Sequence, residues 1–322
     1  MTLDNFRLII VVGLSSIVIV SCGVSSQSAI EKTGAEAFSL MGKPLFPLPL
    51  NKATQDIYLD SLATALSSYE AKPDDSDAII WYGRRIAYLG GYRESIAIFS
   101  EGIRKHPEDA RMYRHRGHRY ITTRQLDKAI ADLEYAARLT NGKKDIIEPD
   151  GLPNKLNIPT STLQSNIWYH LGLTHYVLGN LDAAHRSYQK CLQVSKNNDM
   201  LAATMYWIYL TLRRMGERES ADFLLTKIGD DFDVIENYAY RDLLLLFKGI
   251  IDESDILSDD GNALQNTTIA YGVASWRCIE GDIDGAGRLL DSIISSNYWP
   301  AFGYIAAEAD VASGRCYKGN EK

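Results

Sequence analysis

The chain has 322 residues, of which 46% are hydrophobic, and it carries 34 lysines and arginines against 41 aspartates and glutamates. This is the composition of a folded protein, so collagen-like, low-complexity, wholly disordered and polytopic membrane proteins are excluded. A formal net charge of −7 also argues against a general nucleic-acid binder, and no nucleic acid is expected as a partner.

The N-terminus has the features of a secretory signal. One cation, Arg7, precedes an apolar run from Leu8 to Val20. That run is too short to cross a bilayer as a helix, but it has the length of the apolar region of a signal peptide. It leads through Ser21 into Cys22, and this segment resembles the lipobox of bacterial lipoproteins. The resemblance implies cleavage before Cys22 and lipidation of its sulfur; in the alternative, the signal is an ordinary one and Cys22 is incidental.

A lipoprotein of this kind is held in the bacterial cell envelope by its acyl chains. We therefore predict a signal peptide in residues 1–21 and a lipidated tether in residues 22–50, where serine, alanine and glycine are frequent and three prolines stiffen the end. Because no acidic run follows Cys22, we expect anchoring to the outer membrane on its periplasmic side.

The following part of the chain has an internal period. Gly83 and Gly117 are 34 positions apart, and their neighbours keep the same order of large and small side chains. The clearest copy lies in residues 165–198, at Trp168, Leu171, Gly172, Gly179, Leu181, Ala184, Tyr188 and Cys191. Period and pattern resemble the tetratricopeptide repeat, in which two antiparallel helices pack small residues against large ones. The resemblance implies an all-α fold, a right-handed α-solenoid of antiparallel helix pairs.

The resemblance extends from residue 51 to residue 312. We expect a capping half-repeat in 51–75, repeats 1 and 2 in 76–140, repeat 3 in 165–198, degenerate repeats with a capping helix in 199–312, and a tail in 313–322. Residues 141–164 break the period, because Pro149, Pro153 and Pro159 exclude a regular helix. Long ordered loops often have a function. This insertion either borders the binding groove or is a structural cover.

In this repeat family the first helix of each pair lines the concave surface. Counting from the aligned glycines predicts the side chains of a groove, namely Arg84, Tyr88, Arg111, Arg114, His118, Asn166, Tyr169, Tyr176, Tyr206, Arg213 and Tyr271. Arginine binds carboxylates through parallel hydrogen bonds, and tyrosine adds flat surface with a polar tip. The pattern predicts a basic, tyrosine-lined groove for a protein or an acidic peptide.

Charge is unevenly distributed along the chain. Between Ala78 and Arg124, ten lysines and arginines stand against four acidic residues, whereas from Gly216 onward nine stand against twenty. Two interpretations are open. The basic segment binds an acidic partner, or it pairs with acidic residues of the same molecule, among them Glu101, Glu108, Asp109, Asp132 and the C-terminal half.

No catalytic or cofactor site is recognisable. His115 and His118 could share a helix face, but they lack the glutamate and the third ligand of a HExxH-type zinc site. The four cysteines are too scattered for a zinc site or a disulfide scaffold, and Cys191 is expected to be an inert core thiol. We predict a membrane-anchored scaffold or adaptor without enzymatic activity, cofactor or metal. The alternative is a glycan- or nutrient-binding lipoprotein associated with an outer-membrane transporter.

Overall fold

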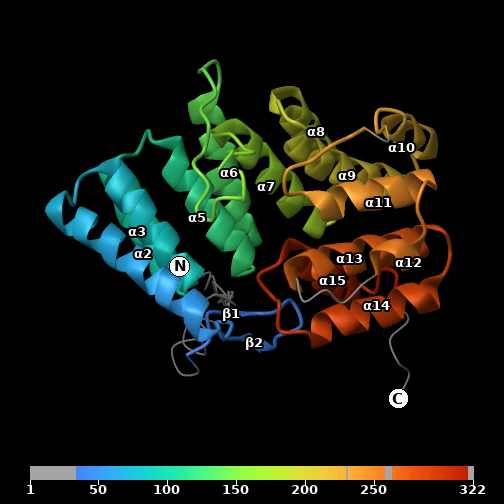
Figure 1. Cartoon of the computed structure of the whole chain (residues 1–322), viewed down its shortest axis with the longest axis horizontal. Helices are drawn as coiled ribbons and strands as arrows, with labels where there is room; N and C mark the ends of the chain where they lie inside the picture. The colour runs from blue at the N-terminus through green and yellow to red at the C-terminus, as the bar shows by residue number, and fades with distance from the viewer. Residues whose placement is uncertain (1–33, 230, 258–262, 318–322) are drawn as a thin grey trace, which may run out of the picture.

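The computed structural model describes residues 34–229, 231–257 and 263–317, and this part of the chain is almost entirely helical (Figure 1). Its helices are α2 (Lys52–Ala71), α3 (Ser76–Tyr88), α4 (Tyr92–Lys105), α5 (Ala110–Thr122), α6 (Leu126–Thr140), α7 (Leu163–Val177), α8 (Leu181–Val194), α9 (Asn198–Met215), α10 (Arg218–Leu225), α11 (Tyr238–Lys248), α12 (Glu253–Ile256), α13 (Ala263–Ile279), α14 (Ile283–Ser295) and α15 (Phe302–Ala312). Successive helices pack against one another along the array, which confirms the predicted all-α solenoid.

Polar caps and tight turns define the first helix pairs. Asp75 and Thr162 accept hydrogen bonds from backbone amides at the starts of α3 and α7. Gly90 and Gly179 follow the first helices of repeats 1 and 3 with φ of +89° and +78°, a region that favours glycine. Arg124 takes the corresponding place in repeat 2 with φ of +60°. A non-glycine residue there costs about 1 kcal/mol or more, so the surrounding structure has to hold it.

Within each of the first three pairs, a glycine of the first helix lies against a large residue of the second. A Cβ atom on Gly172 would lie 2.6 Å from the ring of Tyr188, and one on Gly83 would lie 2.7 Å from the ring of Phe99. These contacts confirm the packing of small against large residues. Cys191 is fully buried among them, and burial raises the pKa of its thiol to about 11, as expected for an inert core cysteine.

The array closes on itself through its last helix. In Figure 1, α13–α15 turn back beneath the array toward its N-terminal end, and α15 packs on α7 as well as on α13. The carboxylate of Glu308 on α15 is completely buried and accepts a hydrogen bond from Arg124 Nε at 2.9 Å. Trp299, just before α15, places its ring 5.3 Å from that of Tyr92 on α4. The C-terminal end therefore contacts the first two repeats directly.

Residues 34–50 are not a tether, so this part of the prediction is wrong. They form a hairpin in which β1 (Ala37–Phe38) pairs antiparallel with β2 (Pro44–Leu45). The Leu40 amide donates to Glu308, and Trp299 Nε1 donates to the carbonyl of Phe46 at 2.7 Å. The hairpin is held by contacts with residues from the other end of the chain. The sequence pattern does not predict these contacts.

The predicted signal peptide and lipidation site lie outside the described residues. Leu8–Val20 and Cys22 belong to this segment, so both assignments stay predictions. Within the part of the chain that the structure describes, no helix combines the length and the hydrophobicity needed to cross a membrane.

The C-terminal repeats carry two features that the pattern does not reveal. The apolar helix expected over residues 235–250 is α11, which starts later because the amides of Ile235, Glu236 and Asn237 donate to the carboxylate of Asp199 at 2.8–3.1 Å. A disulfide joins Cys278 on α13 to Cys316, with their Cα atoms 5.4 Å apart. Residues 313–317, expected to be a tail, are thereby held to the last repeat.

The closure of the array by its last helix is tested by Glu308→Gln. This substitution leaves the Arg124 guanidinium, whose side chain is 3% exposed, without its counter-ion. Breaking a buried ion pair in this way costs about 3–5 kcal/mol, which would lower the urea midpoint of unfolding followed by circular dichroism. Glu134→Gln, at an exposed position on α6, is the matched control and should change stability by less than about 0.5 kcal/mol. Equal midpoints for the two variants would contradict the closure.

Candidate functional site

Four guanidinium groups gather on the first helices of repeats 1 and 2. They belong to Arg84 and Arg85 on α3 and to Arg114 and Arg119 on α5, and we call them the arginine cluster. Arg114 is buried, and its Nη2 lies 2.9 Å from Oε1 of Glu148. Within the described ranges, no carboxylate forms an ion pair with the other three arginines.

The arginine cluster holds more positive charge than its surroundings neutralise. Burial lowers the pKa of Arg119 to about 10, and the neighbouring Arg114 and Arg84 act in the same direction. Arg114 Nε and Glu148 Oε2 are buried without a hydrogen-bond partner among the described residues. Because buried charges and polar groups are normally paired, the arginine cluster is suited to bind a further anionic group.

The insertion in the repeat pattern borders this cluster. We call residues 141–162 the strap; in Figure 1 it crosses in front of α5 between the ends of α6 and α7. Arg84 Nη2 donates to the carbonyl of Pro149 at 2.9 Å, and Arg85 Nη1 donates to that of Gly151 at 2.8 Å. Gly151 lies so close to Tyr88 that a Cβ atom would be 1.6 Å from the tyrosine hydroxyl. The strap is thus held on the concave surface by residues of the predicted groove.

The tyrosines predicted to line the middle of the groove are core residues, so this prediction is wrong. Tyr169, Tyr176, Tyr206 and Tyr271 are each at most 6% exposed. Tyr271 Oη lies 3.1 Å from Tyr176 Oη and donates to the carboxylate of Asp310 on α15 at 3.0 Å. The physical reason is that α13 and α15 pack on α9 and α7 and fill the concave surface there.

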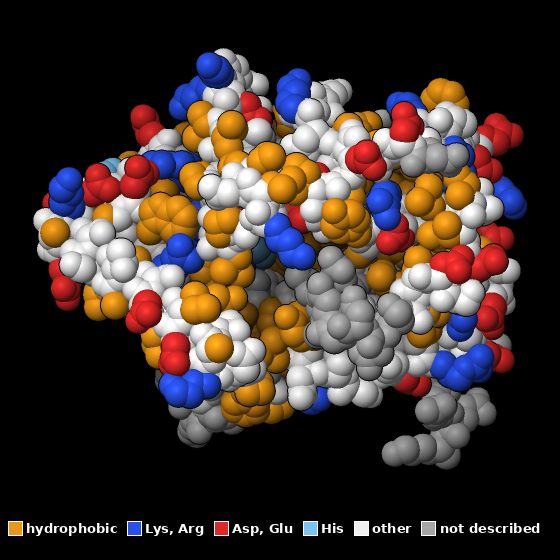
Figure 2. Space-filling view, viewed as in Figure 1, with side chains coloured by type: hydrophobic (Ala, Val, Ile, Leu, Met, Phe, Trp, Pro, Cys, Tyr) orange, Lys and Arg blue, Asp and Glu red, His pale blue; other side chains and the backbone are white. Residues whose placement is uncertain are grey.

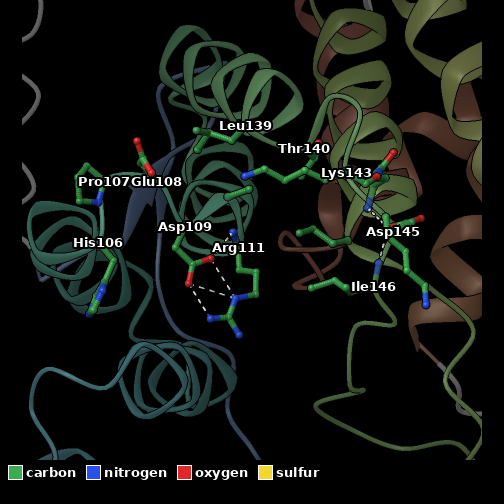
Figure 3. A pocket seen from close by; sticks show the side chains of 14 residues that line it. His106, Pro107, Glu108, Asp109, Arg111, Leu139, Thr140, Lys143, Asp145 and Ile146 are labelled. Atoms are coloured by element: carbon green, nitrogen blue, oxygen red, sulfur yellow. Dashed lines mark hydrogen bonds and ion pairs between the residues drawn. The ribbon is translucent and has the colours of Figure 1, made fainter.

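Three more predicted groove residues have partners within the protein. Arg111 donates to Asp109 through Nε at 2.9 Å, and Figure 3 shows this pair at the edge of a pocket between the turn before α5 and the start of the strap. Arg213 pairs with Glu280 at 2.6 Å, and Asn166 is buried with its amide donating to the strap. For these residues the structure supports internal pairing.

Other parts of the basic segment are paired internally as well. Arg116 binds Asp132 through Nε and Nη2, both at 2.7 Å, and Arg104 pairs with Glu101 on the surface of α4. Among the described residues of this segment, the arginines without an ion pair are Arg93 and three members of the arginine cluster, namely Arg84, Arg85 and Arg119.

His118 lies on the concave surface where the arginine cluster meets α15. Its ring centroid is 4.4 Å from that of His170 and 5.3 Å from that of Phe302. Burial holds the pKa of His118 and of His170 well below the usual value near 6.5, and Arg119 adds to the effect. Among the described residues, no group of three or more histidine, cysteine or acidic side chains is arranged to hold a metal.

Arg85, Arg119 and Glu148 belong to the site but are absent from the predicted groove. Arg85 and Arg119 directly follow Arg84 and His118 in the sequence, and counting one concave position per helical turn passes over such neighbours. Glu148 comes from the insertion, which has no counterpart in the repeat pattern. The sequence feature that points to the two arginines is that each of them directly follows another residue that can carry positive charge.

Three histidines with lowered pKa values predict a measurable pH dependence of stability. His115, His118 and His170 have pKa values that burial lowers, so they stay neutral in the folded chain and take up protons in the unfolded chain near pH 6.5. Stability is therefore present above that pH and is lost as the pH falls below it.

His118→Gln should reduce this dependence by up to one proton, or about 1.4 kcal/mol per pH unit, between pH 6.5 and 5. Urea unfolding at half-unit steps of pH measures the slope for the two proteins. Identical slopes for the variant and the parent would show that His118 takes up its proton in the folded chain over the same pH range as in the unfolded chain.

Comparisons with known proteins found two similarities. The tetratricopeptide repeat family model matches residues 165–198, the segment predicted as repeat 3. The crystal structure of YrrB, described as a TPR protein with an unusual peptide-binding site, superimposes with a TM-score of 0.41 and 14% identity, over 72% of this chain and 91% of that one. No curated protein sequence matches. One segment of this helical chain therefore matches the tetratricopeptide repeat family.

Proposed function

We propose that this chain is a membrane-anchored scaffold of the bacterial cell envelope that binds a protein or an acidic peptide at the arginine cluster. The observation that carries the proposal is the local charge imbalance, in which Glu148 pairs with Arg114 and no carboxylate of the described residues forms an ion pair with Arg84, Arg85 or Arg119. A scaffold needs a preformed surface and no chemistry on its ligand. The helices α3 and α5 supply that surface, because their positions are set by packing within the array.

The donors of the cluster are suited to carboxylates. A guanidinium group has five N–H donors in a planar fork that matches a carboxylate. Arg84 and Arg85 each use one terminal nitrogen on a strap carbonyl, so further donors are available for a ligand. Arg119 stacks over the ring of Tyr92 at 5.4 Å, which fixes its position. A ligand carboxylate bound here would neutralise charge that the protein leaves uncompensated.

The proposed location has support from the cysteine chemistry of the chain. Disulfides persist in oxidising compartments such as the bacterial periplasm and are rare in the cytosol. The bond between Cys278 and Cys316 fits a mature domain on the periplasmic side of the membrane. Attachment through Cys22 fits the same compartment, because lipidation follows export.

Binding at the arginine cluster is tested by Arg119→Glu. Reversing this charge should weaken capture of a protein partner from detergent-solubilised envelopes, or of a synthetic Glu/Asp-rich peptide, by about 10- to 100-fold, because like charges then face the ligand. Arg186→Glu on the exposed surface of α8 is the matched control and should leave binding unchanged. Equal binding by both variants would contradict the proposed site. Saturable sugar binding without a protein partner would favour the glycan-binding alternative.

Membrane attachment is tested by Cys22→Ala. Loss of the thiol removes the acceptor for the lipid, so the variant should accumulate as uncleaved precursor or be released in soluble form. Membrane fractionation and the mass of the purified chain measure the two outcomes. A variant that is processed normally and stays in the membrane fraction would contradict lipidation.

A further inference from the structure

The strap presents an exposed aliphatic surface. Five large side chains within thirteen residues are between 47% and 67% exposed, namely Ile146, Ile147, Leu152, Leu156 and Ile158. Figure 2 shows hydrophobic side chains over the part of the surface where Figure 1 places the strap. Single exposed aliphatic residues are common on proteins, but a group of this size in one segment marks an interaction surface.

The exposed side chains stand on a fixed backbone. Asn154 holds a tight turn, since its Oδ1 accepts from the amides of Leu156 and Ile158 and its Nδ2 donates to the carbonyl of Ile158. The first half of the strap is held by the arginine cluster. At the far end, Thr160 donates to Glu236 and accepts at its carbonyl from Asn197. The aliphatic surface is therefore prearranged for docking and loses little conformational freedom when it docks.

Exposed lysines accompany the aliphatic residues. Lys143, Lys144 and Lys155 are exposed. Two of the three carboxylates of the strap have partners within the protein. Glu148 pairs with Arg114 of the arginine cluster. Asp145 accepts hydrogen bonds from the amides of Ile146 and Gln164 and from the hydroxyl of Thr162. The outer surface of the strap therefore combines apolar bulk with positive charge.

We propose that the strap docks on a membrane surface that contains anionic lipid, with its isoleucines and leucines in the headgroup region and its lysines on lipid phosphates. Protein interfaces are enriched in aromatic residues and arginine and depleted in lysine, whereas aliphatic residues with lysine are typical of segments that lie in a membrane interface. The exposed surface of the strap has the second composition. This proposal goes beyond the scaffold function, because it assigns a surface outside the arginine cluster, and it does not depend on lipidation of Cys22.

The test measures binding of the full chain carrying Cys22→Ala to vesicles of phosphatidylcholine alone and of phosphatidylcholine with 30% phosphatidylglycerol. We expect partitioning onto the anionic vesicles at least about 10-fold above that onto neutral vesicles, decreasing as salt is raised. Amide hydrogen exchange should slow in residues 152–158 on anionic vesicles. This local readout separates the strap from residues 8–20, which are the same in every variant.

Two variants locate the effect. Leu152→Ser with Leu156→Ser should abolish the protection of the strap and reduce anionic partitioning about 10-fold, and Lys143→Glu with Lys144→Glu should do the same. Leu178→Ser with Phe223→Ser, which removes exposed apolar side chains elsewhere, is the matched control and should bind as the parent does. Unchanged exchange on anionic vesicles, or protection of the strap by a protein partner but not by vesicles, would overturn the proposal. Neither result would bear on ligand binding at Arg119.

Discussion

Arg124 and Glu308 form a buried ion pair between the turn after α5 and the last helix, 184 residues apart in the chain. Removing two charges from water is costly, so such a pair persists only where every remaining donor and acceptor is used. Here Arg124 also donates to the carbonyls of Thr122 and Trp299, and Glu308 also accepts from the amide of Leu40. The pair explains why an arginine occupies a left-handed turn where the neighbouring repeats have glycine.

Closing the array divides the concave surface into two parts. In the middle, α13 and α15 fill it, and the hydroxyl of Tyr271 contacts Tyr176, Asp310 and Arg214 there. In the first two repeats the strap lies on it, held by Arg84 and Arg85 on α3 and by Arg114 on α5. Helices and the strap of the same chain thus fill most of the groove. The part that they leave is the basic surface near Arg119.

Local features of the structure follow from the sequence because they depend on residues close together in the chain. The repeat spans one helix pair, so it predicts which positions of the first three pairs are glycine or aromatic. It also predicts the breaks between helices at prolines and the burial of Cys191. Features that join distant segments do not follow from it. The hairpin at Ala37–Leu45, the disulfide between Cys278 and Cys316, and the burial of Tyr176 depend on how far the array curves.

The all-α solenoid and the place of its clearest repeat follow from the sequence, since the pattern of side-chain sizes repeats within one helix pair. The sequence also located the basic segment that contains the arginine cluster. Folding determines which arginines of this segment are neutralised, because Glu148 reaches Arg114 from the insertion, which lies outside the repeat period. Curvature adds up over many repeats, so the chain's own last helix occupies the middle of the groove.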